Sequence, residues 1–175
     1  MVSSGAAYTV LIVLVALERL AELVVSNRNL RWSRQHGGVE TGAGHYPAMV
    51  LLHSALLAGC LVEVWLADRP FLPLLGWPML ALVLAAQALR WWCISTLGPQ
   101  WNTRVVVVPG AGRVSSGPYR HLRHPNYVAV VIEGFALPLV HTAWLTAVIF
   151  SALNAVLLSV RIRSESSALA MLGRT

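Results

Sequence analysis

Long apolar runs separated by short polar segments are the dominant pattern along this chain. Five of these runs predict membrane helices, and they cover residues 6–25, 46–67, 71–92, 127–140 and 143–161. A helix needs about 20 mostly apolar residues to cross a bilayer. The last two runs form one stretch that is too long for an ordinary helix, and Pro138 and the pair His141-Thr142 interrupt it. We therefore predict a hairpin of two helices there, the first of them short for a full crossing.

The composition supports this prediction. Of the 175 residues, 57% are hydrophobic and 11% are charged, whereas about a quarter of the residues in a soluble domain are charged. The predicted fold class is an all-α integral membrane protein with five transmembrane helices in a single domain, residues 1–175. Its predicted parts are three spans in 1–96, a cytoplasmic loop at 97–126, the helical hairpin at 127–161 and a C-terminal tail at 162–175.

The basic residues lie asymmetrically between the predicted spans. All 13 are arginines, and with five spans nearly all of those outside the apolar runs fall on one side, with Arg69 on the other. Positive residues favour the cytoplasmic face. The pattern predicts an N-terminus outside and a C-terminus in the cytoplasm. The Arg-rich, Lys-free composition is typical of a bacterial source, so the expected location is a bacterial inner membrane. We attribute the net charge of +6 to contact with anionic membrane lipid and expect no nucleic-acid partner.

The segment 97–126 is rich in glycine and proline and is the longest one outside the apolar runs. Its residues 104–108 predict a short strand or extended piece. Arg, His, Tyr and Asn side chains crowd residues 117–127, directly before an apolar run. Long ordered loops tend to carry function, and ionisable groups at the edge of a bilayer are costly. We therefore expect a ligand site here.

Several polar residues fall inside the predicted spans. Each alone is typical of an interhelical hydrogen-bond partner, and together they predict a bundle interior that is partly polar. An alternative function follows from them, a small transporter or partner subunit that uses an intramembrane path of acids and does not need the loop 97–126. The acids of that path would be Glu18, Glu22, Glu63 and Glu133.

No metal site is expected. Cys60 and Cys93 lie in apolar runs without metal-ligand spacing. His121 and His124 are three residues apart and lack a third ligand at a suitable spacing. Hydrogen bonding to a polar small molecule suits them better.

Arg161 and Glu165 lie four residues apart at the end of the last apolar run. On a helix this spacing places both on one face. Two interpretations stay open: a salt bridge at a helix end, or a pair in which Glu165 holds a cationic or hydroxyl-bearing group of a ligand and Arg161 holds an anion or positions a substrate oxygen.

Three blocks in the second half of the chain resemble the isoprenylcysteine carboxyl methyltransferase family. They are SGPY at 116–119, RHPNY at 123–127 and RIRSE at 161–165, with a hydrophobic hairpin between the last two. The order and spacing of the blocks are more specific than any one of them. The whole chain looks most like short bacterial members that accompany type III polyketide synthases and are linked to methylation of phenolic lipids.

The resemblance implies a membrane enzyme that uses S-adenosylmethionine in a cytoplasmic pocket, with a lipophilic substrate that enters from the bilayer. Arg161 and Glu165 are the implied catalytic residues, with Glu165 on the cofactor and Arg161 at the reacting oxygen. The implied cofactor-binding residues are Gly112, Arg113, Val114, Tyr119, His124, Pro125, Asn126, Tyr127 and Glu165.

The acceptor favoured by the resemblance is an oxygen of a phenolic, polyketide-derived lipid, and the alternative is an isoprenylcysteine carboxylate. Methylation at nitrogen, as in related phospholipid methyltransferases, ranks lower. A phenol has a pKa near 10, so a cation or a general base would assist its methylation. Arg161 is the candidate cation, and Glu22 or His53 is the candidate base at the substrate.

Overall fold

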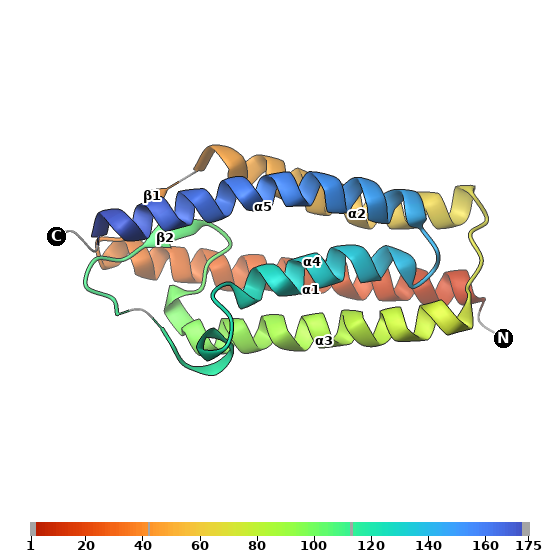
Figure 1. Cartoon of the computed structure of the whole chain (residues 1–175), viewed down its shortest axis with the longest axis horizontal. Coiled ribbons are helices and arrows are strands. Elements are labelled where there is room, and N and C mark those ends of the chain that lie inside the picture. Colours follow the sequence, from red (N-terminus) through yellow and green to blue (C-terminus); the bar gives the residue numbers. More distant parts are fainter. Residues whose placement is uncertain (1–2, 42, 113, 173–175) are drawn as a thin grey trace.

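Five α-helices make up most of the described chain, together with a two-stranded sheet and three short 3-10 helices. The structure, a computed structural model, describes residues 3–41, 43–112 and 114–172. The α-helices are α1 (Ser4–Gln35), α2 (Tyr46–Leu66), α3 (Pro73–Leu97), α4 (Pro125–Leu139) and α5 (Trp144–Leu172). They run alternately in opposite directions along the long axis, so the two termini lie at opposite ends (Figure 1).

The order of the helices confirms the predicted all-α architecture, and their ends differ from the prediction. α1 continues ten residues past the predicted end of its apolar run, and α5 continues through residues 162–172, beyond the predicted hairpin. Hydropathy marks where a helix is apolar. It does not mark where the backbone hydrogen bonds stop, and the arginine and leucine residues of both extensions are good helix formers.

Of the described helices, three are long and apolar enough to cross a membrane: Tyr46–Leu66, Pro73–Gln100 and Trp144–Glu165. α4 is apolar but has only 15 residues. α1 carries Glu18, Arg19 and Glu22 in its central turns. The protein is thus an integral membrane protein by its helices, while a complete crossing by α1 and α4 stays a prediction.

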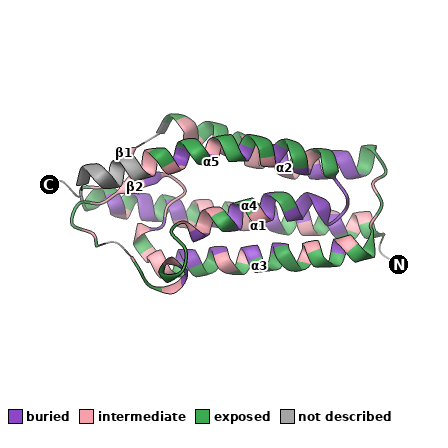
Figure 2. Ribbon diagram, viewed as in Figure 1, coloured by how far each residue is buried: buried purple, intermediate pink, exposed green. Residues whose placement is uncertain are grey.

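Many large apolar residues are exposed on the bundle, and Figure 2 shows exposed residues along the outer sides of the helices. Leu74 is 96% exposed and Leu66 is 82% exposed. A soluble monomer rarely leaves extended apolar surface in water, whereas lipid is a good solvent for it. Inside, α4 packs most extensively against α3, and Gly134 lets α4 approach the Phe150 ring of α5.

The turn between α4 and α5 confirms the predicted hairpin. Thr142 has a left-handed φ of 55°, and its hydroxyl donates to the carbonyl of Pro70 over 2.7 Å. Glu63 of α2 then accepts hydrogen bonds from the backbone N–H groups of Leu145 and Thr146, at 3.1 and 2.7 Å. These N–H groups belong to the first turn of α5 and have no partner within the helix.

A small antiparallel sheet closes the end of the bundle where the C-terminus lies (Figure 1). Strand β1 (Val39–Thr41) pairs with β2 (Val105–Val107), with Glu40 opposite Val106. β2 falls within the extended piece predicted at residues 104–108. The 3-10 helices η1 (Ala43–His45), η2 (Gly98–Gln100) and η3 (Gly117–Arg120) belong to the same end. The loop between α3 and α4 is thereby folded against the helix ends.

Candidate functional site

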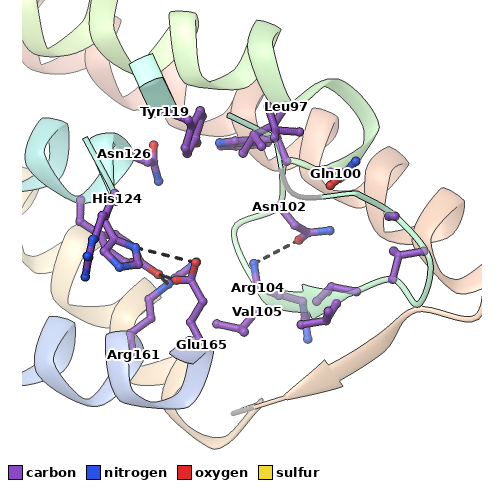
Figure 3. Close-up of a pocket in the computed structure, with 18 of the residues that line it drawn as sticks. Leu97, Gln100, Asn102, Arg104, Val105, Tyr119, His124, Asn126, Arg161 and Glu165 are labelled. Atoms are coloured by element: carbon purple, nitrogen blue, oxygen red, sulfur yellow. Dashed lines mark hydrogen bonds and ion pairs between the residues drawn. The ribbon is translucent and has the colours of Figure 1, made fainter. Parts of the chain in front are cut away.

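A cavity of about 260 Å³ lies at this end of the bundle, between the α3–α4 loop and the adjoining ends of α4 and α5. Figure 3 shows His124, Arg161 and Glu165 gathered on one side and Asn102, Arg104 and Val105 on the other. Side chains from η2, β2, η3, α4 and α5 contribute to its wall. We call this space the polar cavity.

The hydroxyl of Tyr127 joins Arg161 to Glu165. It donates to Oε2 of Glu165 over 2.5 Å and accepts from Nε of Arg161 over 2.9 Å. No direct ion pair joins Arg161 to Glu165 in the part of the chain that the structure describes. The spacing of four residues on α5 therefore serves to bring both charges to a third residue on α4.

His124 lies next to this arrangement. Its ring stacks on that of Tyr127, with centroids 5.3 Å apart and an interplanar angle of 18°. Its Nδ1 lies 3.8 Å from Oε1 of Glu165. Tyr119 reaches the cavity from η3, and burial, followed by the neighbouring Cys93, raises the pKa of its hydroxyl above the ordinary value. The Tyr119 hydroxyl therefore stays protonated at neutral pH and can donate a hydrogen bond.

Most of the predicted cofactor-binding residues meet in the polar cavity. Pro125 is the exception because it is buried at the start of α4, where its missing N–H costs nothing. Arg113 lies outside the described residues. His121 is exposed, and no three potential metal ligands gather within the described chain. The predicted residues that line the cavity are Gly112, Val114, Tyr119, His124, Asn126, Tyr127, Arg161 and Glu165.

The sequence prediction missed the far wall of the polar cavity, which η2 and the chain leading into β2 supply. Its residues include Leu97, Gln100, Trp101, Asn102 and Arg104. The polar side chains that follow α3 were one available signal, because they interrupt a segment that is otherwise apolar.

A second cavity of about 160 Å³ lies deeper between the helices and is mostly lined by apolar side chains from α1, α2, α4 and α5. We call it the apolar cavity. Glu22, His53 and Arg161, the three predicted substrate residues, all line it. The two cavities share four wall residues: Trp101, Asn126, Tyr127 and Arg161.

The tautomer of His53 leaves one ring nitrogen able to accept a proton. Its Nδ1 lies 2.8 Å from the carbonyl oxygen of Met49. A carbonyl can only accept a hydrogen bond, so Nδ1 carries the proton and Nε2 keeps its lone pair. The edge of Phe150 holds the ring, with centroids 5.4 Å apart and an interplanar angle of 86°.

Glu22 belongs instead to a buried ion cluster with Arg19, Arg90 and Glu133. Its carboxylate lies 2.7 Å from Arg19 and 3.5 Å from Arg90. Glu133 lies 2.5 Å from Arg90 and 3.3 Å from Arg19. The cluster ties α1, α3 and α4 together. Two arginines therefore lie against the Glu22 carboxylate, which forms part of the packing between the helices.

The acids of the transport alternative are all engaged. Glu22 and Glu133 pair with arginines, and Glu63 pairs with Arg69 at 2.9 Å besides holding the start of α5. Glu18 accepts hydrogen bonds from the Gln87 amide and the Trp91 indole. Such side chains stabilise contacts between helices, and none of these contacts favours transport.

The chemistry of the polar cavity fits S-adenosylmethionine. Its ammonium and ribose groups call for a carboxylate, which Glu165 offers. Its carboxylate calls for cations, and Arg123 lines the cavity together with Arg104, whose guanidinium also pairs with Glu40 at 2.7 Å. Its adenine and sulfonium suit aromatic faces, which Tyr119 and the stacked His124–Tyr127 pair provide.

A family model described as isoprenylcysteine carboxyl methyltransferase matches residues 79–171 of this chain. The match covers more than half of the sequence and includes most of α3, the four residues shared by both cavities, all of α4 and nearly all of α5. The chain belongs to the isoprenylcysteine carboxyl methyltransferase family. It is therefore a membrane methyltransferase by family, and the predicted resemblance is confirmed.

Two relatives of this methyltransferase extend over nearly its whole length. An uncharacterized protein of Bacillus subtilis (strain 168), YpbQ, is 38% identical over 163 residues, which are 93% of this chain and 96% of that protein. An uncharacterized protein of Haemophilus influenzae (strain ATCC 51907 / DSM 11121 / KW20 / Rd) is 26% identical over 157 residues, 88% of this chain and 90% of its own length. No solved structure shows a significant match to the chain.

Proposed function

We propose that this protein transfers the methyl group of S-adenosylmethionine to an oxygen of a lipophilic acceptor. The observation that carries the proposal is the shared wall of the two cavities. A polar cavity with cofactor-like chemistry and an apolar cavity between the helices meet at Tyr127 and Arg161. Two ligands held on either side of one wall would have their reacting groups next to each other, which is what group transfer requires.

In this proposal the polar cavity holds the cofactor, which supplies an electrophilic methyl group on a sulfonium. Glu165 binds the ammonium or the ribose hydroxyls, and Tyr119 and His124 present aromatic faces. Tyr127 fixes the side chains of Arg161 and Glu165 through two hydrogen bonds. Residues of η2 and of the chain leading into β2 line the cavity on the other side.

The apolar cavity holds the acceptor, with its reacting oxygen toward Arg161. The guanidinium favours a negatively charged oxygen as the acceptor loses its proton. Nε2 of His53 takes that proton in our proposal, in preference to Glu22, whose carboxylate is held by two arginines. The apolar lining agrees with a lipid chain entering from the bilayer.

We propose a phenolic lipid as the acceptor, with an isoprenylcysteine carboxylate as the alternative. Methyl transfer from labelled S-adenosylmethionine to a 4-alkylphenol and to S-farnesylcysteine distinguishes the two. Turnover of the phenol supports the first acceptor, and turnover of S-farnesylcysteine alone favours the second. The Arg-rich cavity end would face the cytoplasm, where S-adenosylmethionine is made, with the N-terminus outside the inner membrane.

Calorimetric titration of S-adenosylmethionine into the detergent-purified full chain tests the cofactor proposal. We expect binding by the wild type and a loss of about tenfold or more in Glu165→Gln, because a hydrogen bond to a charged group is worth about 1.5–3 kcal/mol. The matched control is Asp68→Asn, which changes one exposed acid at the opposite end of the bundle. A folded wild type that binds no S-adenosylmethionine overturns the proposal.

A further inference from the structure

The shared wall of the two cavities holds hydrogen-bonding capacity that the protein does not use. Tyr127 and Arg161 bind each other there. The indole Nε1 of Trp101 and Oδ1 of Asn126 are buried and have no hydrogen-bond partner among the described residues. Buried polar atoms almost always have partners, and an unsatisfied one costs free energy. A donor and an acceptor left over at one wall therefore point to a ligand group.

Trp101 is held firmly at this position. Its side chain is 2% exposed. The Asn29 side chain of α1 donates to the carbonyls of Trp101 and Gly98, at 2.7 and 3.0 Å. The next residues are fixed as well, since Ser26 Oγ accepts from the backbone N–H of Thr103 over 3.1 Å. Asn29 and Ser26 are both buried, so α1 anchors the segment that carries the indole.

We infer that the Trp101 indole N–H donates a hydrogen bond to the reacting oxygen of the acceptor and so orients it at the junction. This inference rests on the proposed function and adds a substrate-positioning residue to it. An indole N–H can only donate, so its ligand atom is an acceptor such as oxygen. A hydroxyl suits the wall better than a carboxylate, because a bound hydroxyl can donate to Asn126 Oδ1 before its proton passes to Nε2 of His53 in the proposed reaction.

The acceptor oxygen is favoured over the cofactor because Trp101 also lines the apolar cavity, beside Arg161. The cofactor's carboxylate already has cations near it in Arg104 and Arg123, on the polar side alone. The indole N–H is a neutral donor next to Arg161. It would orient the acceptor oxygen and leave it nucleophilic. Trp101 would thereby set the angle at which the oxygen meets the methyl group.

The test uses 4-dodecylphenol and dodecylbenzene, two probes with the same chain that differ in one oxygen. Native mass spectrometry counts the bound fraction of each on the full chain, in wild type, Trp101→Phe and Trp77→Phe. Phenylalanine removes the N–H and keeps an aromatic ring. Trp77 is the control because it is 62% exposed on the outer face of α3. Calorimetry with S-adenosylmethionine and thermal unfolding accompany each variant.

We expect the wild type and Trp77→Phe to prefer the phenol about tenfold, and Trp101→Phe to lose about fivefold of that preference, the size of one hydrogen bond. S-adenosylmethionine affinity should stay unchanged, and the unfolding temperature of Trp101→Phe should fall only modestly, because the smaller ring leaves some space at a buried site. A full preference in Trp101→Phe, no preference in the wild type, or a selective loss of S-adenosylmethionine affinity in Trp101→Phe would each overturn the inference. Wild-type turnover of the phenol, measured in parallel, tests the proposed function separately.

Discussion

Arg161 and Glu165 lie one turn apart on α5 and are connected through the hydroxyl of Tyr127, with no direct ion pair within 4.0 Å between them in the described chain. A simple salt bridge at a helix end would leave both side chains outside any site. Here α4 contributes the central hydroxyl, and both charges line the polar cavity. The position of α4 relative to α5 thus converts a common helical spacing into a site.

Tyr127→Phe should lower kcat/KM for methyl transfer by about tenfold or more. The variant loses both hydrogen bonds that fix Arg161 and Glu165, and hydrogen bonds to charged groups are worth about 1.5–3 kcal/mol each. Steady-state assays with labelled S-adenosylmethionine measure the effect. Tyr8→Phe serves as the control, since the Tyr8 hydroxyl binds the Leu137 carbonyl far from either cavity. Equal activity of Tyr127→Phe and wild type would contradict the assigned role.

Glu63→Gln should destabilise the protein by about 1–2 kcal/mol and leave methyl transfer intact. The carboxylate holds the first turn of α5 and pairs with Arg69, and an amide weakens these charge-assisted bonds. Thermal unfolding in detergent and the transfer assay measure the two effects. A variant that is stable but inactive would contradict this prediction and support the alternative of an intramembrane path through Glu63.

Removing one charged residue from the buried ion cluster leaves its partner uncompensated, whereas removing an oppositely charged pair does not. Arg90→Met leaves Glu22 and Glu133 with less compensation, and an uncompensated buried charge costs about 3–5 kcal/mol. The double variant Arg90→Met/Glu133→Gln should therefore be less destabilised than the sum of its single variants. Unfolding of all four proteins gives the coupling free energy. Additive losses would show that Arg90 and Glu133 do not interact energetically.

His45 should make stability fall as the pH decreases. Burial, followed by the charge of Arg161, lowers the pKa of His45 below its ordinary value of 6.5. The unfolded chain then binds a proton at a higher pH than the folded protein does. Stability therefore declines as the pH falls through and below about 6.5. At pH 8, His45 is neutral in both the folded and the unfolded state and does not affect stability.

Thermal unfolding of wild type and His45→Gln between pH 5 and pH 8 measures this contribution. The two proteins should agree at pH 8, and the variant should lose less stability toward pH 5. His121→Gln, a change at an exposed position, controls for the substitution itself. A wild type that gains stability relative to His45→Gln on acidification would reverse the sign of the prediction.

Hydropathy along the chain is enough to predict the helices and their order. Apolar runs of membrane length require helices, because only hydrogen bonds within the segment can satisfy its backbone in lipid. The same reading located the hairpin turn near His141 and the extended piece that became β2. The resemblance to the family, rather than hydropathy, identified eight of the residues that line the polar cavity, from Gly112 to Glu165, and six of them occur in the three motif blocks.

Which distant side chains meet depends on tertiary packing. Strand β1 was not predicted, because a strand of three residues forms only beside a pairing partner, and its partner β2 is distant in the sequence. Nothing in the neighbouring sequence marks Trp101 as a site residue, since tryptophan is common in membrane proteins. That its indole N–H has no partner among the described residues follows only from the packing of the helices. Hydropathy also could not show that Glu22 pairs with Arg19 and Arg90 while His53 keeps Nε2 open. Helix formation is local, whereas these contacts depend on how five helices are rotated against one another.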